Sequence, residues 1–352
     1  FYGDLSEVTT LSFTIEHDTP EPTGASSVLF LPGIMGSQLF EESDACGDEL
    51  EVRTRWFSRD SCDQLRLKTT FLGESIHEIF TTNEQSSVVD EILTLNLYKS
   101  FLEELADMKS DGVIADYKAL PYDWRLMLKD VVYSSEIDGR VFGGEADTIQ
   151  DGLLYKTVAK LAESSHSGKV SIVTHSNGGL VSKDFLYRLE EENDPLLAKI
   201  DNLFLVGVPQ SGTPESVVSL LHGTDIGLGF ILDQTTSREL VNQSPFIHHL
   251  LPSEDYFASD VAEEFPVISF QVGELTNSWR EKYGENIDTV EELQAFLSKE
   301  SGRPKPAREA LLQPEVVDPF LLNYAETTHA LQSAWTPPAS LEVHELAGTG
   351  VS

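Results

Sequence analysis

A serine lies at a predicted turn between a strand and a helix in the middle of the chain. The local sequence is Thr174-His175-Ser176-Asn177-Gly178. It approximates the pattern Gly-x-Ser-x-Gly, in which a strained backbone exposes a serine hydroxyl and the neighbouring side chains must be small. Thr174 departs from the pattern, because a threonine stands in place of the first glycine. The sequence predicts that Ser176 is a nucleophile, with a helix N-cap as the alternative role.

The segments on either side of Ser176 have the periodicity that such a turn requires. Residues 170–173 are mostly apolar, as in a buried strand, and apolar residues recur at helical spacing over 180–189. A strand that runs directly into a helix favours the nucleophile over the N-cap.

A serine nucleophile requires N–H donors for the oxyanion of the tetrahedral intermediate, and two backbone amides are candidates. Asn177 follows the serine in the first turn of the predicted helix, where amides are unpaired and the helix dipole favours negative charge. The second candidate is Met35, within the Pro- and Gly-containing segment 31–37 that follows the first apolar run. The alternative for that segment is a plain Pro-Gly turn. We expect the amides of Met35 and Asn177 to form an oxyanion hole.

Continuous apolar runs alternate with helical segments over much of the chain. Strand-like runs occur at Val28–Leu31, Lys169–Thr174 and Asn202–Val208, and helical patterns occur at Ser100–Met108 and Leu180–Leu189. Continuous apolar strands separated by helices indicate a parallel sheet that is buried on both faces. The predicted fold class is therefore α/β, with a mostly parallel, doubly wound sheet.

Two stretches interrupt this alternation. One is polar and holds both cysteines, over about 40–72, and the other is long and mostly helical, over about 215–336. In doubly wound folds such insertions follow the strand ends where ligands bind. We predict a lid insertion and a cap insertion inside one domain of residues 25–352. Residues 1–24 are predicted to be an upstream strand, Thr10–Asp18, followed by a linker.

The chain is strongly acidic, with 24 Lys and Arg against 59 Asp and Glu and a formal net charge of −35 over 352 residues. No basic footprint is left for a nucleic-acid backbone, so nucleic acid is excluded as a partner. No apolar run approaches the ~18 residues that span a bilayer. Membrane contact is expected to be peripheral and made by exposed apolar side chains rather than by charge. Nothing in the sequence implies a partner protein.

Neither the two cysteines nor the pair His248-His249 predicts a metal site. Cys46 and Cys62 stand sixteen positions apart, and two cysteines are too few for a zinc site by themselves. From the residues alone, a disulfide and two free thiols are equally open. His248 and His249 cannot face the same way on a regular element. The acidic runs match no calcium-loop spacing, and we expect neither a metal nor a cofactor.

Three motifs together resemble a bacterial member of the lecithin:cholesterol acyltransferase-like family of α/β-hydrolases. They are Leu-Pro-Gly-Ile-Met-Gly-Ser-Gln-Leu at 31–39, Ala-Leu-Pro-Tyr-Asp-Trp-Arg-Leu at 119–126 and Thr-His-Ser-Asn-Gly-Gly at 174–179. Segments 208–214, 250–253 and 341–348 also fit, so the similarity extends from about residue 26 to the last residue. The resemblance implies the α/β-hydrolase fold and acyl transfer through a serine.

The resemblance also implies roles for flanking residues. The residue at the Met35 position lends an oxyanion amide, and the loop from 38 to about 72 is a lid tied by a disulfide. This favours a Cys46–Cys62 bridge and an extracellular, cell-surface or periplasmic location. We interpret Asp123-Trp124-Arg125 as a buried structural clamp, with a wall of the acyl pocket as the alternative. His175 is interpreted as a packing residue.

The predicted function is that of a serine esterase, lipase or O-acyltransferase acting on acyl esters, above all lipid esters, through an acyl-Ser176 intermediate. Two alternatives remain. One is an esterase for small soluble esters, and the other is a non-catalytic surface or binding module on a hydrolase scaffold.

The acid and base that would activate Ser176 are expected beyond the last residue. In an α/β-hydrolase the acid follows a later strand and the histidine follows the last one. In the resembling family both partners come after the stretch that matches 341–348, and only four residues follow it here. We therefore expect a chain truncated before its acid and base, with slow turnover as the consequence.

Candidates inside the chain fit less well by position. Glu274, after the strand-like run 266–272, is a nominal acid. His329 falls in a predicted helix, and His344 falls within its strand rather than beyond it. We expect no imidazole other than that of the preceding residue within ~4 Å of the Ser176 hydroxyl.

Overall fold

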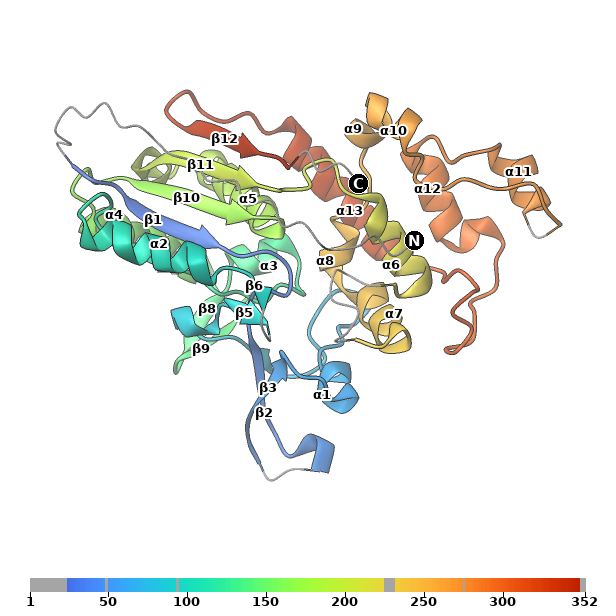
Figure 1. The fold of residues 1–352 in the computed structure, drawn as a ribbon, viewed down its shortest axis with the longest axis horizontal. Helices are drawn as coiled ribbons and strands as arrows, with labels where there is room; N and C mark the ends of the chain where they lie inside the picture. Colours follow the sequence, from blue (N-terminus) through green and yellow to red (C-terminus); the bar gives the residue numbers. More distant parts are fainter. Residues whose placement is uncertain (1–23, 48–49, 93–94, 225–231, 275, 349–352) are drawn as a thin grey trace.

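A five-stranded sheet lies at the centre of the molecule (Figure 1). The computed structural model describes residues 24–47, 50–92, 95–224, 232–274 and 276–348, so the predicted strand Thr10–Asp18 lies outside the described residues. The sheet strands are β1 (Ser27–Leu31), β7 (Tyr117–Ala119), β10 (Val170–His175), β11 (Ile200–Val206) and β12 (Glu342–Leu346). Their order is β12-β11-β10-β1-β7 and every neighbouring pair is parallel. The predicted α/β class with a parallel sheet is confirmed.

Helices cover both faces of this sheet (Figure 1). Every residue of β1 is buried, and successive side chains of a strand point to opposite faces. Phe30 packs with Leu102 and Leu105 of α2 (Lys99–Ser110). Leu29 belongs to the larger core on the other face. Burial on both faces explains why the central strands are continuous apolar runs. The helices that follow the strands are α3 (Leu128–Val132), α4 (Leu153–Ser164) and α5 (Asn177–Glu191).

The segment after β1 forms a small antiparallel sheet and a short helix. Its elements are β2 (Leu39–Ser43), β3 (Glu51–Trp56), β4 (Ile79–Phe80) and α1 (Ser61–Leu65). A disulfide joins Cys46 to Cys62, with 5.9 Å between the Cα atoms, which confirms the predicted bridge. Beside it Arg55 is fully buried and ion-paired with Glu41 and Asp63. A bridge closing a loop of this length adds ~3 kcal/mol to the free energy of unfolding.

The segment between β11 and β12 is helical and lies beside the sheet, at the right of Figure 1. Its helices are α6 (Pro214–His222), α7 (Gln234–Gln243), α8 (Pro245–His248), α9 (Glu254–Phe257), α10 (Asp260–Glu264), α11 (Asn277–Tyr283), α12 (Val290–Leu297) and α13 (Pro319–Ala334). Two short strand pairs also occur: β5 (Glu91–Ile92) with β6 (Leu95–Asn96), and β8 (Ser135–Ile137) with β9 (Arg140–Phe142). The described 3-10 turns are η1 (Ala45–Gly47), η2 (Gln85–Ser87), η3 (Ile149–Asp151), η4 (Pro195–Lys199) and η5 (Lys299–Ser301). Within the described ranges, every helix is too short or too polar to span a lipid bilayer.

The strand-like run 266–272 is not a strand, so this expectation was wrong. Its only sheet-like contact among the described residues is an isolated bridge between Ser269 and Asn286. The ring of Phe270 packs instead against Trp279 and Phe296, with centroid distances of 5.8 and 5.5 Å. The apolar character of the run reflects burial among helices rather than in a sheet.

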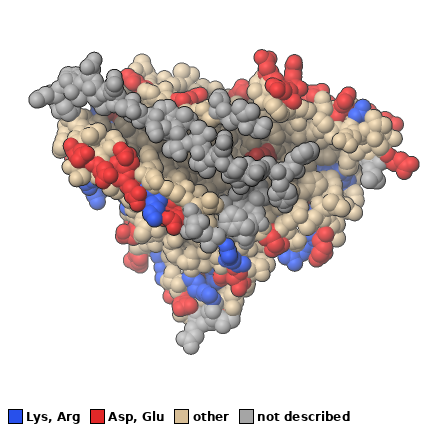
Figure 2. Space-filling view, viewed as in Figure 1, with Lys and Arg blue, Asp and Glu red and all other residues tan. Residues whose placement is uncertain are grey.

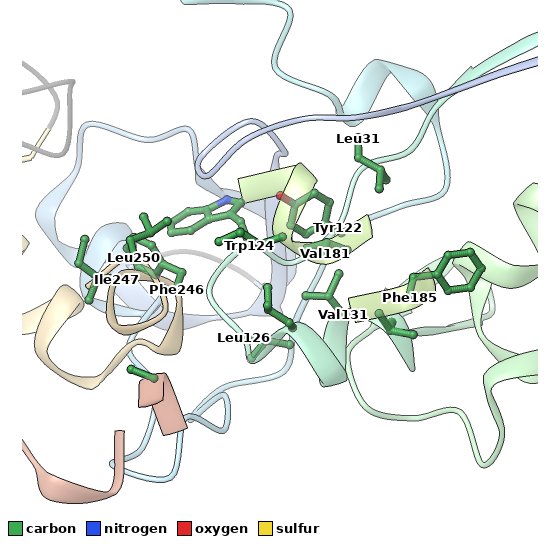
Figure 3. Close-up of a cluster of buried hydrophobic side chains, with 14 of the residues drawn as sticks. Leu31, Tyr122, Trp124, Leu126, Val131, Val181, Phe185, Phe246, Ile247 and Leu250 are labelled. Atoms are coloured by element: carbon green, nitrogen blue, oxygen red, sulfur yellow. The ribbon is translucent and has the colours of Figure 1, made fainter. Parts of the chain in front are cut away.

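The segment 123–125 joins the sheet to both insertions. Trp124 packs edge-on against Trp56, with 5.5 Å between ring centroids. It also packs edge-on against Phe246 of α8, at 5.2 Å between ring centroids (Figure 3). Arg125 pairs with Asp123 in the interior and donates to the Leu67 carbonyl at 2.8 Å. These contacts fit the predicted clamp, since every charged atom of the pair has a partner. Trp124 and Arg125 also line a small cavity together with Met35, as the alternative of a pocket wall predicts.

Candidate active site

Ser176 occupies the sharp turn between β10 and α5. Its backbone has φ 51° and ψ −125°, in the left-handed region that residues with a side chain rarely adopt. The Ser176 amide donates to the Val206 carbonyl at 3.0 Å, and the Gly179 amide donates to the Ser176 carbonyl at 2.9 Å. The hydroxyl makes no capping hydrogen bond to α5, which argues against the N-cap role. The strained conformation that the sequence predicted at this serine is therefore present.

Two glycines bring the loop after β1 into contact with this turn. A Cβ atom at Gly178 would lie 2.5 Å from the Leu31 carbonyl oxygen, and one at Gly33 would lie 3.0 Å from the Ser176 Cβ. A side chain at Gly178 would clash with the backbone of the loop, and one at Gly33 would force Ser176 or His175 to shift. Thr174, the departure from the glycine pattern, is buried and donates its hydroxyl to the Phe204 carbonyl at 2.9 Å. The turn tolerates this threonine because its only polar atom is satisfied on β11.

Met35 and Asn177 are both buried: Asn177 directly follows Ser176, and Met35 lies in the loop whose Gly33 contacts the Ser176 turn. Met35 is 5% exposed and has φ 60°, and its carbonyl accepts a hydrogen bond from Trp56 Nε1 at 2.8 Å. Asn177 is 1% exposed and begins α5. Neither backbone amide donates to an acceptor anywhere in the described part of the chain. Unpaired backbone N–H groups are the kind of donor that an oxyanion requires, so these two amides stay the predicted candidates.

Tyr98, just before α2, contacts both the loop after β1 and the turn at Ser176. The sequence did not predict this role. Its hydroxyl accepts a hydrogen bond from the Gly33 amide at 2.9 Å and lies 2.9 Å from His175 Nδ1. His175 is therefore a hydrogen-bonding residue as well as a ring contact, which corrects its interpretation as a packing residue. A single tyrosine at the start of a helix carries no local sequence signal for this role.

A buried polar network lies behind Asn177. His249 Nε2 donates to Asn177 Oδ1 at 2.7 Å, and Asn177 Nδ2 donates to the Tyr122 hydroxyl at 3.3 Å. The Tyr122 hydroxyl in turn donates to the Pro32 carbonyl at 2.7 Å. Burial lowers the pKa of His249 to about 3, so its imidazole is neutral. The network ties the first residue of α5 to the loop that holds Met35.

None of the nominal acid and base candidates forms a hydrogen bond with Ser176 in the described part of the chain. His329 Nε2 donates to the His249 carbonyl at 2.9 Å, and His344 stacks on Phe204 at 4.5 Å between ring centroids. Glu274 is exposed, and no described residue forms a hydrogen bond with the Ser176 hydroxyl. In the ranges that the structure covers, no three His, Cys, Asp or Glu side chains are grouped so as to hold a metal ion.

Comparison with known proteins points to one family. A family model for lecithin:cholesterol acyltransferase matches residues 86–303. The lecithin-cholesterol acyltransferase-like 4 protein of Arabidopsis thaliana is 22% identical over 267 residues, which are 72% of this chain and 46% of the relative. The chain thus spans about half the length of the curated relative that it matches.

Solved structures share less sequence with the chain. The crystal structure of a Tle4-Tli4 complex aligns over 91% of this chain and 74% of its own, with a TM-score of 0.47 and 14% identity. That of Bacillus licheniformis lipase BlEst2 in mature form aligns over 79% of this chain and 82% of its own, with a TM-score of 0.28 and 12% identity.

Proposed function

The chain belongs to the lecithin:cholesterol acyltransferase family and has its α/β-hydrolase fold, and from that premise we propose that it transfers the acyl group of an ester through Ser176. The substrate class is an acyl ester, and we assign a lipid ester as the specific one. The observation that carries the proposal is the strained Ser176 turn packed against a glycine-containing loop. The next residue, Asn177, and Met35 of that loop each have an unpaired backbone amide among the described residues.

The proposed first step forms a covalent intermediate. The Ser176 hydroxyl gives up its proton to water, Oγ bonds to the carbonyl carbon of the ester, and the carbonyl oxygen becomes an oxyanion. The amides of Met35 and Asn177 donate to that oxygen, which stabilises the charge as it develops. Collapse of the intermediate releases the alcohol, which takes up a proton, and leaves acyl-Ser176. Water or a second alcohol then attacks the acyl group and regenerates the serine.

The two insertions have proposed roles around this serine. We assign the segment of about 40–72 as a lid and that of about 215–336 as a cap over the acyl chain. In support, Leu67, Leu240 and Phe246 of these segments line a small cavity together with Met35. The Cys46–Cys62 bridge supports an oxidising compartment, that is, an extracellular, cell-surface or periplasmic location.

Substitution of the serine tests this function. We expect Ser176→Ala to abolish hydrolysis of p-nitrophenyl butyrate and of a long-chain ester, because no other group replaces Oγ. The melting temperature should equal that of the parent, since alanine and serine are equally strained at φ 51°. Ser165→Ala, remote from the turn, is the matched control and should keep full activity. Hydrolysis by Ser176→Ala at the parental rate would contradict the assignment.

The dependence of the hydrolysis rate on the concentration of a long-chain ester distinguishes a lipid substrate from small soluble esters. A rate that rises sharply above the micelle threshold of the long-chain ester supports a lipid substrate. Equal rates on both sides of the threshold favour small soluble esters. Absence of a fluorophosphonate adduct at Ser176, under conditions that label a control esterase, favours the non-catalytic module, whereas slow turnover with a labelled Ser176 does not.

A further inference from the structure

His249, just after α8, forms a hydrogen bond with the residue that follows Ser176. It belongs to the helical segment of about 215–336 that we assign as a cap, and its Nε2 lies 2.7 Å from Asn177 Oδ1. The two residues are 72 positions apart in the sequence, and each is 1% exposed. One buried hydrogen bond thus joins the cap segment to the residue whose backbone amide we assign to the oxyanion hole.

The surroundings of His249 fix the direction of this hydrogen bond. An amide oxygen only accepts, so Nε2 of His249 carries the proton and Nδ1 of the neutral ring does not. Nδ1 lies 3.4 Å from the hydroxyl of Tyr324 on α13, and that hydroxyl also accepts the Leu128 amide at 3.0 Å. Burial raises the pKa of Tyr324, so its own proton stays available to Nδ1. The imidazole therefore keeps its donor on the side of Asn177.

Helix α13 also holds the two elements that this bond connects. His329 Nε2 donates to the His249 carbonyl at 2.9 Å, which fixes the backbone of the histidine. Gln332, one helical turn later, donates to the Leu180 carbonyl in the first turn of α5 at 3.0 Å. Both His249 and the start of α5 are therefore bonded to the same helix.

The side chain of Asn177 is bonded at both ends of its amide. Its oxygen accepts from His249, and its nitrogen donates to the Tyr122 hydroxyl at 3.3 Å. Tyr122 donates in turn to the carbonyl of Pro32, in the loop that continues to Met35. Rotation of the Asn177 side chain would break both bonds of its amide. Since the side chain and the backbone N–H of Asn177 are joined through one Cα atom, a fixed side chain limits the movement of the N–H.

This network is neutral although the molecule is strongly acidic. Acidic side chains are spread over the face that Figure 2 shows, and the chain has a net charge of −35. Among the described residues, no charged group takes part in the hydrogen bonds of the His249, Asn177 and Tyr122 side chains. A carboxylate at the same place would repel a developing oxyanion. Neutral side chains position a donor without that cost.

We propose that His249 is a positioning residue for the reaction at Ser176, because its Nε2–H holds the Asn177 side chain and thereby keeps the Asn177 backbone amide directed at the oxyanion. The inference rests on the proposed function and gives the cap segment a part in the rate of the reaction. The neighbouring His248 lies outside this network, since its Nδ1 donates to the Ser244 carbonyl at 2.9 Å.

Fluorophosphonate labelling of the whole chain tests this role, with the limiting rate constant and the half-saturating reagent concentration measured separately. We expect His249→Phe to lower the limiting rate constant about 30-fold, because a displaced oxyanion donor slows the reacting step. The half-saturating concentration should not change. His249→Gln should label within about threefold of the parent, because the glutamine amide nitrogen can donate where Nε2 does. The matched control is His248→Phe, at an equally buried neighbour, which should label like the parent.

Asn177→Ala removes the same contact from its other side and keeps the test valid if His249→Phe does not fold. This variant retains the backbone amide and leaves the cap segment unchanged, and its limiting rate constant should also fall about 30-fold. Without the acceptor, His249→Phe should have no further effect in the Asn177→Ala chain, because the two substitutions remove one interaction.

Several results would overturn the inference. Labelling of His249→Phe or Asn177→Ala at the parental rate would show that the bond does not position the amide. Equal slowing in His248→Phe, or losses that multiply in the double variant, would indicate a purely structural role. A parent chain without an adduct, under conditions that label a control esterase, would refute the proposed function and this inference with it. A labelled parent with unaffected variants would refute the inference alone.

Discussion

Tyr98 is the side chain that connects the two halves of the candidate site. Its hydroxyl lies within hydrogen-bonding distance of the Gly33 amide and of His175, so it fixes the loop that precedes Met35 against the turn at Ser176. Burial raises the pKa of Tyr98, and the hydroxyl therefore stays protonated at neutral pH. An oxyanion hole is effective only when its donors are fixed before the reaction, so this contact bears on rate more than on folding.

We expect Tyr98→Phe to lower kcat/KM for ester hydrolysis about tenfold, because losing this positioning contact should raise the activation free energy by ~1.4 kcal/mol. The melting temperature should fall only slightly, since the ring keeps its edge contact with Phe30 at 5.0 Å. Steady-state kinetics and thermal unfolding measure the two effects. Tyr117→Phe on β7 is the control, and a Tyr98→Phe enzyme as fast as the parent would show that the hydroxyl does not position the loop.

Helix α8 and its neighbour His249 form the element that packs under the start of α5. Both His248 and His249 are fully buried, and burial lowers their pKa values to about 4 and about 3. The usual pKa of about 6.5 returns when the chain unfolds. The unfolded state then binds protons that the native state does not, so the free energy of unfolding falls as the pH drops below about 6.5.

We expect the free energy of unfolding to depend on pH through the buried His249. Through His249, each unit of pH below about 6.5 should lower the free energy of unfolding by up to about 1.4 kcal/mol, and this loss should accumulate until the pH approaches 3. His249→Gln should unfold in urea with a smaller loss of stability between pH 7 and pH 5 than the parent. His166→Gln, at an exposed position, serves as the control with an unchanged loss. Identical losses in all three proteins would contradict the neutral, buried His249.

The elements also show what the sequence can and cannot predict. Strands β1, β10 and β11 were predicted because their sequences are largely apolar runs. β1 is buried throughout, and the other two strands alternate buried with half-buried residues over most of their length. Strand β7 has only three residues, one of them a lysine, and no such run exists. At the site, the Ser176 turn was readable because its residues are contiguous. Tyr98 and His249 reach it from distant elements through tertiary packing, which no local pattern records.

Charge governs the behaviour of the molecule as a whole. With a net charge of −35, repulsion between carboxylates opposes the compact folded state, apart from local ion pairs. Raising the salt concentration from 0.1 M to 1 M shortens the screening length from about 10 Å to about 3 Å. Repulsion between surface carboxylates then weakens more than the pairing of buried charges such as Arg55 and Glu41.

We therefore expect the melting temperature to rise by several degrees between 0.1 M and 1 M NaCl, as measured by calorimetry. Sucrose at equal osmolarity is the comparison, because it does not screen charge and separates screening from solute exclusion. A melting temperature that falls with NaCl would mean that attractive surface pairs, and not repulsion, dominate the field of the protein.

The most direct test of the central claim is the mass of the intact chain after reaction with a fluorophosphonate. The account predicts a single adduct, mapped by peptide sequencing to Ser176 between β10 and α5. The adduct should be absent from Ser176→Ala and from the urea-unfolded chain, because reactivity depends on the folded turn and its oxyanion donors. No adduct under conditions that fully label a control serine esterase, or an adduct on another residue, would contradict Ser176 as the nucleophile.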